Sequence, residues 1–151
     1  MPAISEMEFE ITSTNDPTAE DLAVLRAGLG NHGETIFGTT WEKAAAYFLR
    51  DPDGTVCGGV YGFYGSFGWL YIDTLWVSKE LRGAGYAIRL MQQIESEAAA
   101  HGCTGAYLNT FSFQAPDFYK KLGYTVFGEL EDFPTGYTRL FLRKKLAEPA
   151  R

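Results

Sequence analysis

The stretch Leu75–Ala87, LWVSKELRGAGYA, decides the fold. It begins inside Trp69–Val77, a run of aromatic and β-branched side chains that predicts a central β-strand. It ends inside Tyr86–Ala100, where apolar residues recur on one helical face and predict an α-helix that Gly102 closes. These apolar residues are Ala87, Ile88, Met91, Ile94 and Ala98. A strand, a basic glycine-rich turn and a helix therefore follow one another directly.

The turn between this strand and this helix is suited to hold an anion. It leaves several backbone N–H groups unpaired, and the helix dipole adds partial positive charge at the same place. Gly83 and Gly85 remove the side chains that would hold a phosphate away, and Arg82 adds a fixed cation. The turn predicts a pyrophosphate site. The alternative is a glycine-rich turn that serves only the entry into the helix.

Two common phosphate motifs do not describe this turn. A Walker loop ends in Lys-Ser or Lys-Thr, which is absent here, and a dinucleotide fingerprint has Gly-x-Gly-x-x-Gly near the start of a chain. The spacing here is Arg-Gly-x-Gly-x-Ala, and it follows a middle strand.

The elements on either side predict an α/β domain with a mixed sheet. A strand at Ala106–Thr110 after the helix makes a parallel β–α–β crossover. Two hairpins flank this unit and predict antiparallel pairs. Their strands are Tyr47–Arg50 with Thr55–Tyr64, and Tyr124–Leu130 with Tyr137–Leu142, and a short helix is predicted at Pro116–Leu122.

The N-terminal part predicts three further elements. Glu8–Thr12 is expected to be an opening strand, and Ala19–Leu29 a helix whose capping box is Thr18 with Asp21. Asn31–Thr40 is expected to be a loop or a short helix.

Two segments resemble the motifs of the GNAT N-acetyltransferase superfamily. The acetyl-CoA pattern Arg/Gln-x-x-Gly-x-Gly/Ala matches at Arg82, Gly85 and Ala87. The segment Ala115–Tyr124, APDFYKKLGY, resembles the family signature A-x-x-x-Tyr-x-x-Leu-Gly-Phe/Tyr. Motif resemblance covers about Tyr71–Gly128. It implies a GNAT-like fold, with a central sheet of six to seven strands and about four helices, and an enzyme that uses acetyl-CoA as acyl donor.

The resemblance also implies roles for individual residues. Backbone groups around Trp76 and Val77 would pair with the pantetheine arm, and the Val77 region would polarise the thioester carbonyl. Tyr119 matches the general acid that protonates the departing thiolate; alternatively, its phenol only packs against the pantetheine. Backbone N–H groups of the turn would hold the pyrophosphate, and they belong to Arg82, Gly83, Ala84, Gly85, Tyr86 and Ala87.

One position departs from the family pattern. The family often has Asn three residues before the Ala of the signature, which is Ala115 here, and this chain has Ser112 at that place. Asn109 lies just upstream and is a candidate to substitute. We assign Asn109, Ser112 and Ala115 to the cofactor site on this basis.

Asp73 is the candidate for the base. An amine with a pKa near 10 must lose a proton before it attacks. Asp73 lies in an apolar run, where a carboxylate needs a partner. By strand alternation it shares a face with Tyr71, Leu75 and Val77 unless a bulge intervenes. Asp73 accepts the proton or anchors the ammonium under this hypothesis; the alternative is a structural carboxylate bonded to neighbouring backbone or hydroxyl groups.

Composition narrows the class of protein. The 151 residues predict a single domain over 1–151 with a frayed tail at 146–151. The formal net charge of −6 disfavours a nucleic-acid partner. Cys57, Cys103, His32 and His101 show no ligand spacing, so no metal is expected. The chain shows neither a signal sequence nor an apolar run long enough for a membrane, and a cytoplasmic location is expected.

The acceptor is left open by the sequence. The leading expectation is a small-molecule amine; a peptide N-terminus or lysine, and a non-catalytic acyl-CoA-binding module, are the alternatives. An acidic rim could attract a cationic amine, and aromatic residues could line its pocket. The acidic residues are Glu34, Glu129, Glu131 and Asp132, and the aromatic ones Tyr61, Phe63, Trp69 and Tyr71. A homodimer through edge strands or the last hairpin is compatible with the sequence.

Overall fold

The computed structural model describes residues 1–146, and its contacts divide the chain into two compact units, Met1–Thr39 and Thr40–Arg151. Whether the whole chain behaves as one domain stays a prediction. Of the predicted tail, Leu146 is buried, and its N–H donates to the carbonyl of Thr104 at 2.9 Å. The remainder, 147–151, lies outside the described residues.

The first unit contains a short 3₁₀ helix, η1 (Ile4–Glu6), and the helix α1 (Ala19–Phe37). One half of the predicted capping box is confirmed, because the Thr18 hydroxyl accepts from the Asp21 N–H at 3.0 Å. No return bond from the Thr18 N–H to the Asp21 carboxylate is present among the described residues. The helix is longer than predicted. Gly28 and Gly30 lie inside it, since a glycine weakens a helix by only about 1 kcal/mol and does not by itself end one. Of Asn31–Thr40, expected to be a loop or a short helix, residues 31–37 therefore continue α1.

The predicted opening strand at Glu8–Thr12 is wrong. These residues form neither helix nor strand, and no strand of residues 1–146 pairs with them. A strand needs a neighbour to satisfy its backbone, and five alternating residues without one carry too little stabilisation.

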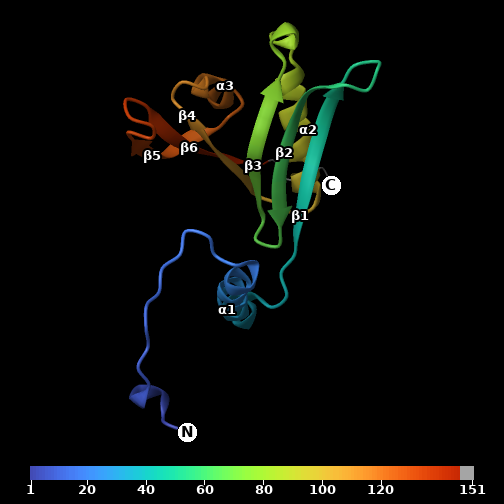
Figure 1. Ribbon diagram of the computed structural model, residues 1–151. Coiled ribbons are helices and arrows are strands. Elements are labelled where there is room, and N and C mark those ends of the chain that lie inside the picture. The colour runs from blue at the N-terminus through green and yellow to red at the C-terminus, as the bar shows by residue number, and fades with distance from the viewer. Residues whose placement is uncertain (147–151) are drawn as a thin grey trace. The chain divides into compact units, whose positions relative to one another are not determined.

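The second unit is built on a six-stranded sheet of order β1-β2-β3-β4-β6-β5 (Figure 1). β3 and β4 are parallel, and both predicted hairpins are antiparallel, as the sequence predicts. The other neighbours, β2 with β3 and β4 with β6, are antiparallel as well. The strands are β1 (Glu42–Arg50), β2 (Val56–Gly65), β3 (Trp69–Val77), β4 (Gly105–Phe111), β5 (Thr125–Glu131) and β6 (Thr138–Lys145). This mixed α/β architecture is the predicted fold class.

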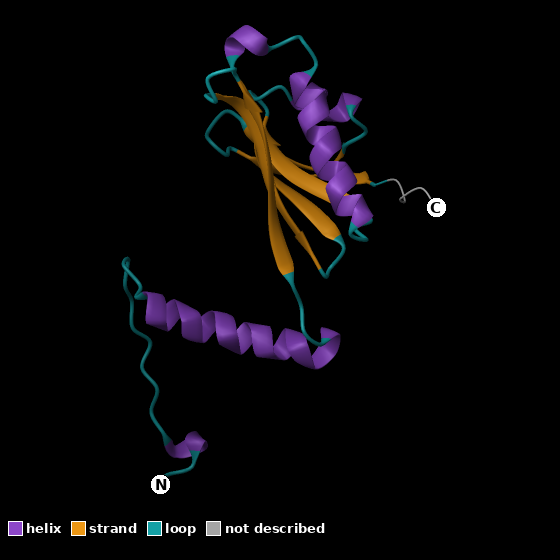
Figure 2. Ribbon diagram, turned by 90° about the vertical axis from the view of Figure 1, so that its right-hand side faces the viewer, coloured by secondary structure: helices purple, strands orange, loops and turns teal. Residues whose placement is uncertain are grey.

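The helix α2 (Tyr86–Ala100) makes the crossover from β3 to β4 and lies along one face of the sheet (Figure 2). Met91, Ile94 and Ala98 of the predicted apolar face are buried, as the helical spacing predicts. Ala87 is half-buried and Ile88 is exposed, so the first turn of the predicted face is not part of the buried core. The strand residues Leu70, Ala106 and Leu142 are completely covered in the core that this helix shares with the sheet. The short 3₁₀ helix η2 (Lys79–Leu81) lies between β3 and α2, and α3 (Pro116–Lys121) between β4 and β5.

A β-bulge interrupts β3 at its middle. Tyr61 pairs with Thr74 and Gly62 with Ile72, so Asp73 has no partner on β2. The extra residue shifts the alternation, and buried residues are Leu70 and Ile72 before it but Val77 after it. The exception allowed for a bulge therefore applies: Asp73 is exposed, whereas Val77 belongs to the core.

A polar cluster ties α2 to the second half of the sheet. The Tyr124 hydroxyl donates to Glu95 Oε2 at 3.0 Å, and Lys144 Nζ donates to Glu95 Oε1 at 2.6 Å. Both Glu95 and Tyr124 are buried. Burial, followed by the neighbouring Glu95 charge, strongly raises the pKa of Tyr124, which keeps this phenol protonated as a donor. The cluster holds the segment after α3, and with it the orientation of α3.

Candidate active site

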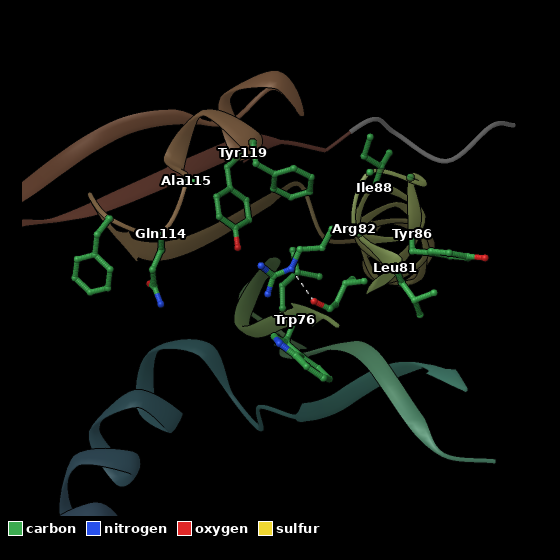
Figure 3. Close-up of a pocket in the computed structure, with 15 residues that line it drawn as sticks. Trp76, Leu81, Arg82, Tyr86, Ile88, Gln114, Ala115 and Tyr119 are labelled. Atoms are coloured by element: carbon green, nitrogen blue, oxygen red, sulfur yellow. Dashed lines mark hydrogen bonds between the residues drawn. The ribbon is translucent and has the colours of Figure 1, made fainter. Parts of the chain in front are cut away.

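A cavity of about 770 Å³ opens where β3 ends, between the glycine-rich turn, the first turn of α2 and α3 (Figure 3). It lies entirely within the second unit. Nine of the predicted site residues line it: Trp76, Val77, Arg82, Gly83, Gly85, Tyr86, Ala87, Ala115 and Tyr119. Its remaining wall is mainly apolar and consists of Leu75, Leu81, Ile88, Phe113, Gln114 and Phe118.

The turn presents free backbone donors. No N–H group from Gly83 to Ile88 has a hydrogen-bond acceptor within residues 1–146, and the first bond of this helix end runs from the Arg89 N–H to the Gly85 carbonyl at 3.1 Å. Gly83 and Gly85 both have positive φ, 85° and 84°, a region that favours glycine. Consecutive free donors at a helix N-terminus suit a phosphate group.

The Arg82 side chain is hydrogen-bonded to the end of β3, where this turn begins. Its Nε donates to the carbonyl oxygen of Val77 at 3.1 Å, the bond dashed in Figure 3. The bond uses one of the five guanidinium donors, so the terminal nitrogens stay available to a ligand. Arg82 therefore brings a positive charge to the cavity while it closes the turn against the end of β3.

β3 and β4 part beside the cavity. Their parallel pairing runs from Trp69 with Gly105 to Ile72 with Leu108, and no pair follows although both strands continue. Beyond the bulge, the edge of β3 that faces β4 thus has no ladder partner in the described chain. Such a free edge can accept an extended ligand as an added strand.

Tyr119 enters the cavity from α3. Figure 3 shows its ring directed from α3 into the cavity, with the hydroxyl at the tip. Its ring packs edge-on against Phe118 at 5.2 Å and Tyr124 at 6.1 Å, which fixes its direction. The hydroxyl has no hydrogen-bond partner in the part of the chain that the structure describes. Burial raises the pKa of Tyr119 above its ordinary value of 10.0, so the phenol is a proton donor at neutral pH.

Ala115 adds a backbone feature to the same wall. It precedes α3 with φ 50° and ψ 61°, a left-handed conformation that costs a residue with a Cβ about 1–2 kcal/mol. The sequence motif indicated this position but not its conformation.

Four predicted site residues do not line the cavity: Asp73, Ala84, Asn109 and Ser112. Asp73 lies exposed on the bulge and accepts from the Thr74 hydroxyl at 2.7 Å. The Ser112 hydroxyl accepts from the Thr138 N–H at 3.0 Å. The Asn109 side chain is held by Arg139 and Tyr71. The roles of Ala84, Asn109 and Ser112 toward the donor, and that of Asp73 toward the amine, stay predictions.

Phe113 and Gln114 are wall residues that the sequence reasoning missed. They directly precede Ala115, and Gln114 Oε1 accepts from the Phe111 N–H at 3.3 Å, which closes the turn into α3. The sequence did offer one signal for them, because both residues directly precede the family signature that begins at Ala115.

The residues considered for the acceptor lie elsewhere. Three of the four aromatic candidates, Phe63, Trp69 and Tyr71, line a second cavity of about 490 Å³ in the same unit. Glu129, Glu131 and Asp132 are exposed, and Asp132 caps its own turn through a bond from the Gly136 N–H at 3.2 Å. Glu34 belongs to the first unit.

Residues 1–146 contain no group of three or more His, Cys, Asp or Glu side chains placed to hold a metal ion. Cys57 and Cys103 are free thiols. None of the helices in the same range has the length and apolarity needed to span a membrane.

Comparison with known proteins agrees with this geometry. The sequence model of the acetyltransferase (GNAT) family matches residues 14–124. The chain is 32% identical to the acetyltransferase Atu2258 of Agrobacterium fabrum over 139 residues, which is 92% of this chain and 99% of that protein. It is 39% identical to the blasticidin-S acetyltransferase of Streptomyces morookaense over 94 residues, 62% of this chain and 68% of that one.

A solved structure supports the same assignment. The crystal structure of an acetyltransferase from Bacillus cereus superposes with a TM-score of 0.81 at 32% identity, covering 89% of this chain and 98% of that one. The family model, the curated relative and the solved structure agree with one another. This chain belongs to the GNAT family of acetyltransferases, which use acetyl-CoA.

Proposed function

We propose that this acetyltransferase moves the acetyl group of acetyl-CoA directly to a primary amine of a small molecule. The observation that carries the proposal is the set of free N–H groups from Gly83 to Ile88 beside a cavity that the Tyr119 hydroxyl enters. The 39% identity to a protein named blasticidin-S acetyltransferase supports a small-molecule acceptor.

The donor would lie along the turn and the free edge of β3. Amide donors from Gly83 to Ala87, helped by the Arg82 guanidinium, would bind the pyrophosphate, and backbone groups of Trp76 and Val77 would pair with the pantetheine. The Arg82 N–H, also expected among these donors, is instead bonded to the carbonyl of Lys79 at 3.3 Å. Ala115 would contact the arm from α3. We retain Asn109 and Ser112 as candidates for side-chain contacts, although both are engaged within the fold.

Two proton transfers accompany the proposed reaction. The amine loses a proton, its nitrogen bonds to the acetyl carbon, and the carbon–sulfur bond breaks. Tyr119 would give its proton, or a hydrogen bond, to the departing thiolate. Asp73 would take the amine proton directly or through water, or anchor the ammonium, because its exposed position on the bulge makes it reachable from solvent.

An amine panel tests the proposal. Thiol release from acetyl-CoA is measured over amino acids, polyamines, aminoglycoside-like compounds and lysine peptides, with Tyr119→Phe in parallel. Turnover of small amines over peptides supports the proposal, and the reverse preference supports a peptide acetyltransferase. Tight acetyl-CoA binding without release from any amine would instead identify a non-catalytic acyl-CoA-binding module. Gel filtration of the same protein tests the predicted homodimer.

A further inference from the structure

Arg139 is a cation held in a fixed orientation on the sheet face turned away from α2. It lies on β6 between Thr138 and Leu140, and its neighbours Leu140 and Leu142 face the core. Its Nε and Nη2 both donate to Asn109 Oδ1, at 2.9 and 2.6 Å. Asn109 Nδ2 in turn donates to the Tyr71 hydroxyl at 3.2 Å. This network fixes the plane of the guanidinium.

Aromatic rings surround the same guanidinium. Its carbon lies 4.8 Å from the centre of the Phe133 ring, 5.5 Å from that of Phe111 and 5.7 Å from that of Phe141. Such rings attract a cation but do not neutralise it.

Arg139 has no acidic partner in the described chain. No carboxylate of residues 1–146 lies within 4.0 Å of it, whereas Lys144 on the same strand is paired with Glu95 at 2.6 Å. Two donors of Nη1 and one of Nη2 are left without an acceptor in the same range. A half-buried, oriented and unpaired guanidinium in a chain of net charge −6 suits an anionic ligand.

A continuous aromatic wall joins Arg139 to the acetyl-donor cavity. The Phe111 ring under the guanidinium stacks on Phe113 with centres 5.1 Å apart and planes 5° apart, and Phe113 lines the cavity. Asn109 is the first residue of β4 beyond the last pair with β3, so the network lies where the two strands part.

We infer that the acceptor carries a carboxylate as well as its amine, and that Arg139 binds this carboxylate through its free N–H donors. The inference rests on the proposed function and narrows its substrate to amino acids and related amino carboxylates. The amine end would reach the parted strands while the carboxylate stays on the guanidinium. Asn109 and the three rings are positioning residues that orient Arg139.

Matched substrates test the inference. Each of several L-amino acids is compared with its carboxamide and with the corresponding decarboxylated amine, and kcat/KM is measured by thiol release. A charge-assisted hydrogen bond typically changes affinity about 10–100-fold, so wild type should favour the carboxylate by that factor. Arg139→Gln should reduce the ratio to near 1, and Arg139→Lys should keep part of it, because lysine retains the charge without the planar fork.

Arg143→Gln is the matched control. Arg143 lies four residues further along β6 on the same face, over Phe127 at 5.4 Å, and belongs to no part of the proposed network. It should leave the carboxylate preference unchanged. Calorimetry with acetyl-CoA reports whether each variant keeps the donor site.

Two results would overturn the inference while leaving the proposed function intact. One is wild-type turnover of carboxamides as fast as of the acids, and the other is an undiminished preference in Arg139→Gln. Release of thiol from other small amines of the panel but from neither series would also overturn the inference alone, whereas release from no small amine would overturn the proposed function and the inference with it. Should Arg139→Gln fail to fold, the wild-type ratio and Arg139→Lys still decide.

Discussion

Arg82 Nε donates a hydrogen bond of 3.1 Å to the carbonyl oxygen of Val77. The bond closes the turn between β3 and α2 on itself and holds the guanidinium at the rim of the cavity. One side chain thus shapes the turn whose amides are free and adds the positive charge that an anion there would meet. The two effects can be separated by mutation.

Arg82→Ala should weaken acetyl-CoA binding about 10–100-fold, because a charge-assisted contact to phosphate is lost together with the brace on the turn. Arg82→Lys should bind with intermediate affinity, since it keeps the charge but lacks the fork. Titration calorimetry with acetyl-CoA measures both. Lys79→Ala, a charge change in the same turn outside the cavity, is the control and should alter the affinity only slightly. Equal effects of Arg82→Ala and Lys79→Ala would remove Arg82 from the donor site.

Tyr119→Phe should lower kcat about 10²–10⁴-fold, the range for loss of a positioned acid. Donor binding should change little, because the ring stays in place. Calorimetry with acetyl-CoA checks this second point. An unchanged kcat would assign the phenol to packing alone.

The pH profile carries a second signature of Tyr119. The protonated phenol is the active form, and burial raises its pKa above 10.0, so activity should persist as pH rises and decline only above pH 10. Initial rates, corrected for uncatalysed thioester hydrolysis, measure this decline at high pH. Tyr119→Phe should lack it, and a wild-type decline with a midpoint below pH 10 would contradict the assignment.

Asp73→Asn should reduce kcat/KM about 10²-fold if the carboxylate takes the amine proton or anchors the ammonium. The matched variant Thr74→Val removes only the 2.7 Å bond from the neighbouring hydroxyl and keeps the carboxylate. It should therefore retain most of the activity. If Asp73→Asn has the same turnover and pH profile as wild type, Asp73 has no role in the reaction and is a structural residue of the bulge.

The sequence predicts the elements around the turn well because their signals are local. Trp69–Val77 and Tyr86–Ala100 have the predicted bounds, since side-chain composition, helical spacing and flanking glycines agree there. The parallel crossover follows from their order along the chain. Nine of the fifteen residues that line the cavity were likewise predicted from the sequence, because the family motifs lie in two short segments.

The missed features depend on contacts that are distant in sequence. The bulge at Asp73 arises from the pairing with β2, where Gly62 lets the two backbones approach closely beside Tyr71, and no pattern within β3 alone indicates it. Arg139 shows no motif, because its setting is assembled from β4, β6 and the last hairpin turn. The length of α1 was missed because glycines lowered the local helical signal without ending the helix.

The polar cluster of Glu95, Tyr124 and Lys144 stabilises the part of the fold that holds Tyr119. Tyr124→Phe removes one donor to a buried carboxylate that keeps Lys144 as its partner, and it should reduce the free energy of unfolding by about 1–2 kcal/mol. Glu95→Ala leaves both the phenol and the ammonium without their acceptor and should cost more, about 2–3 kcal/mol. Denaturant unfolding measures both. Since Tyr124 packs on the Tyr119 ring, Tyr124→Phe keeps that ring contact, and kcat should fall far less than in Tyr119→Phe. A loss of activity equal to that of Tyr119→Phe would mean that turnover depends on the hydroxyl of Tyr124 as much as on that of Tyr119, and that the phenol of Tyr119 is not distinguished as the acid.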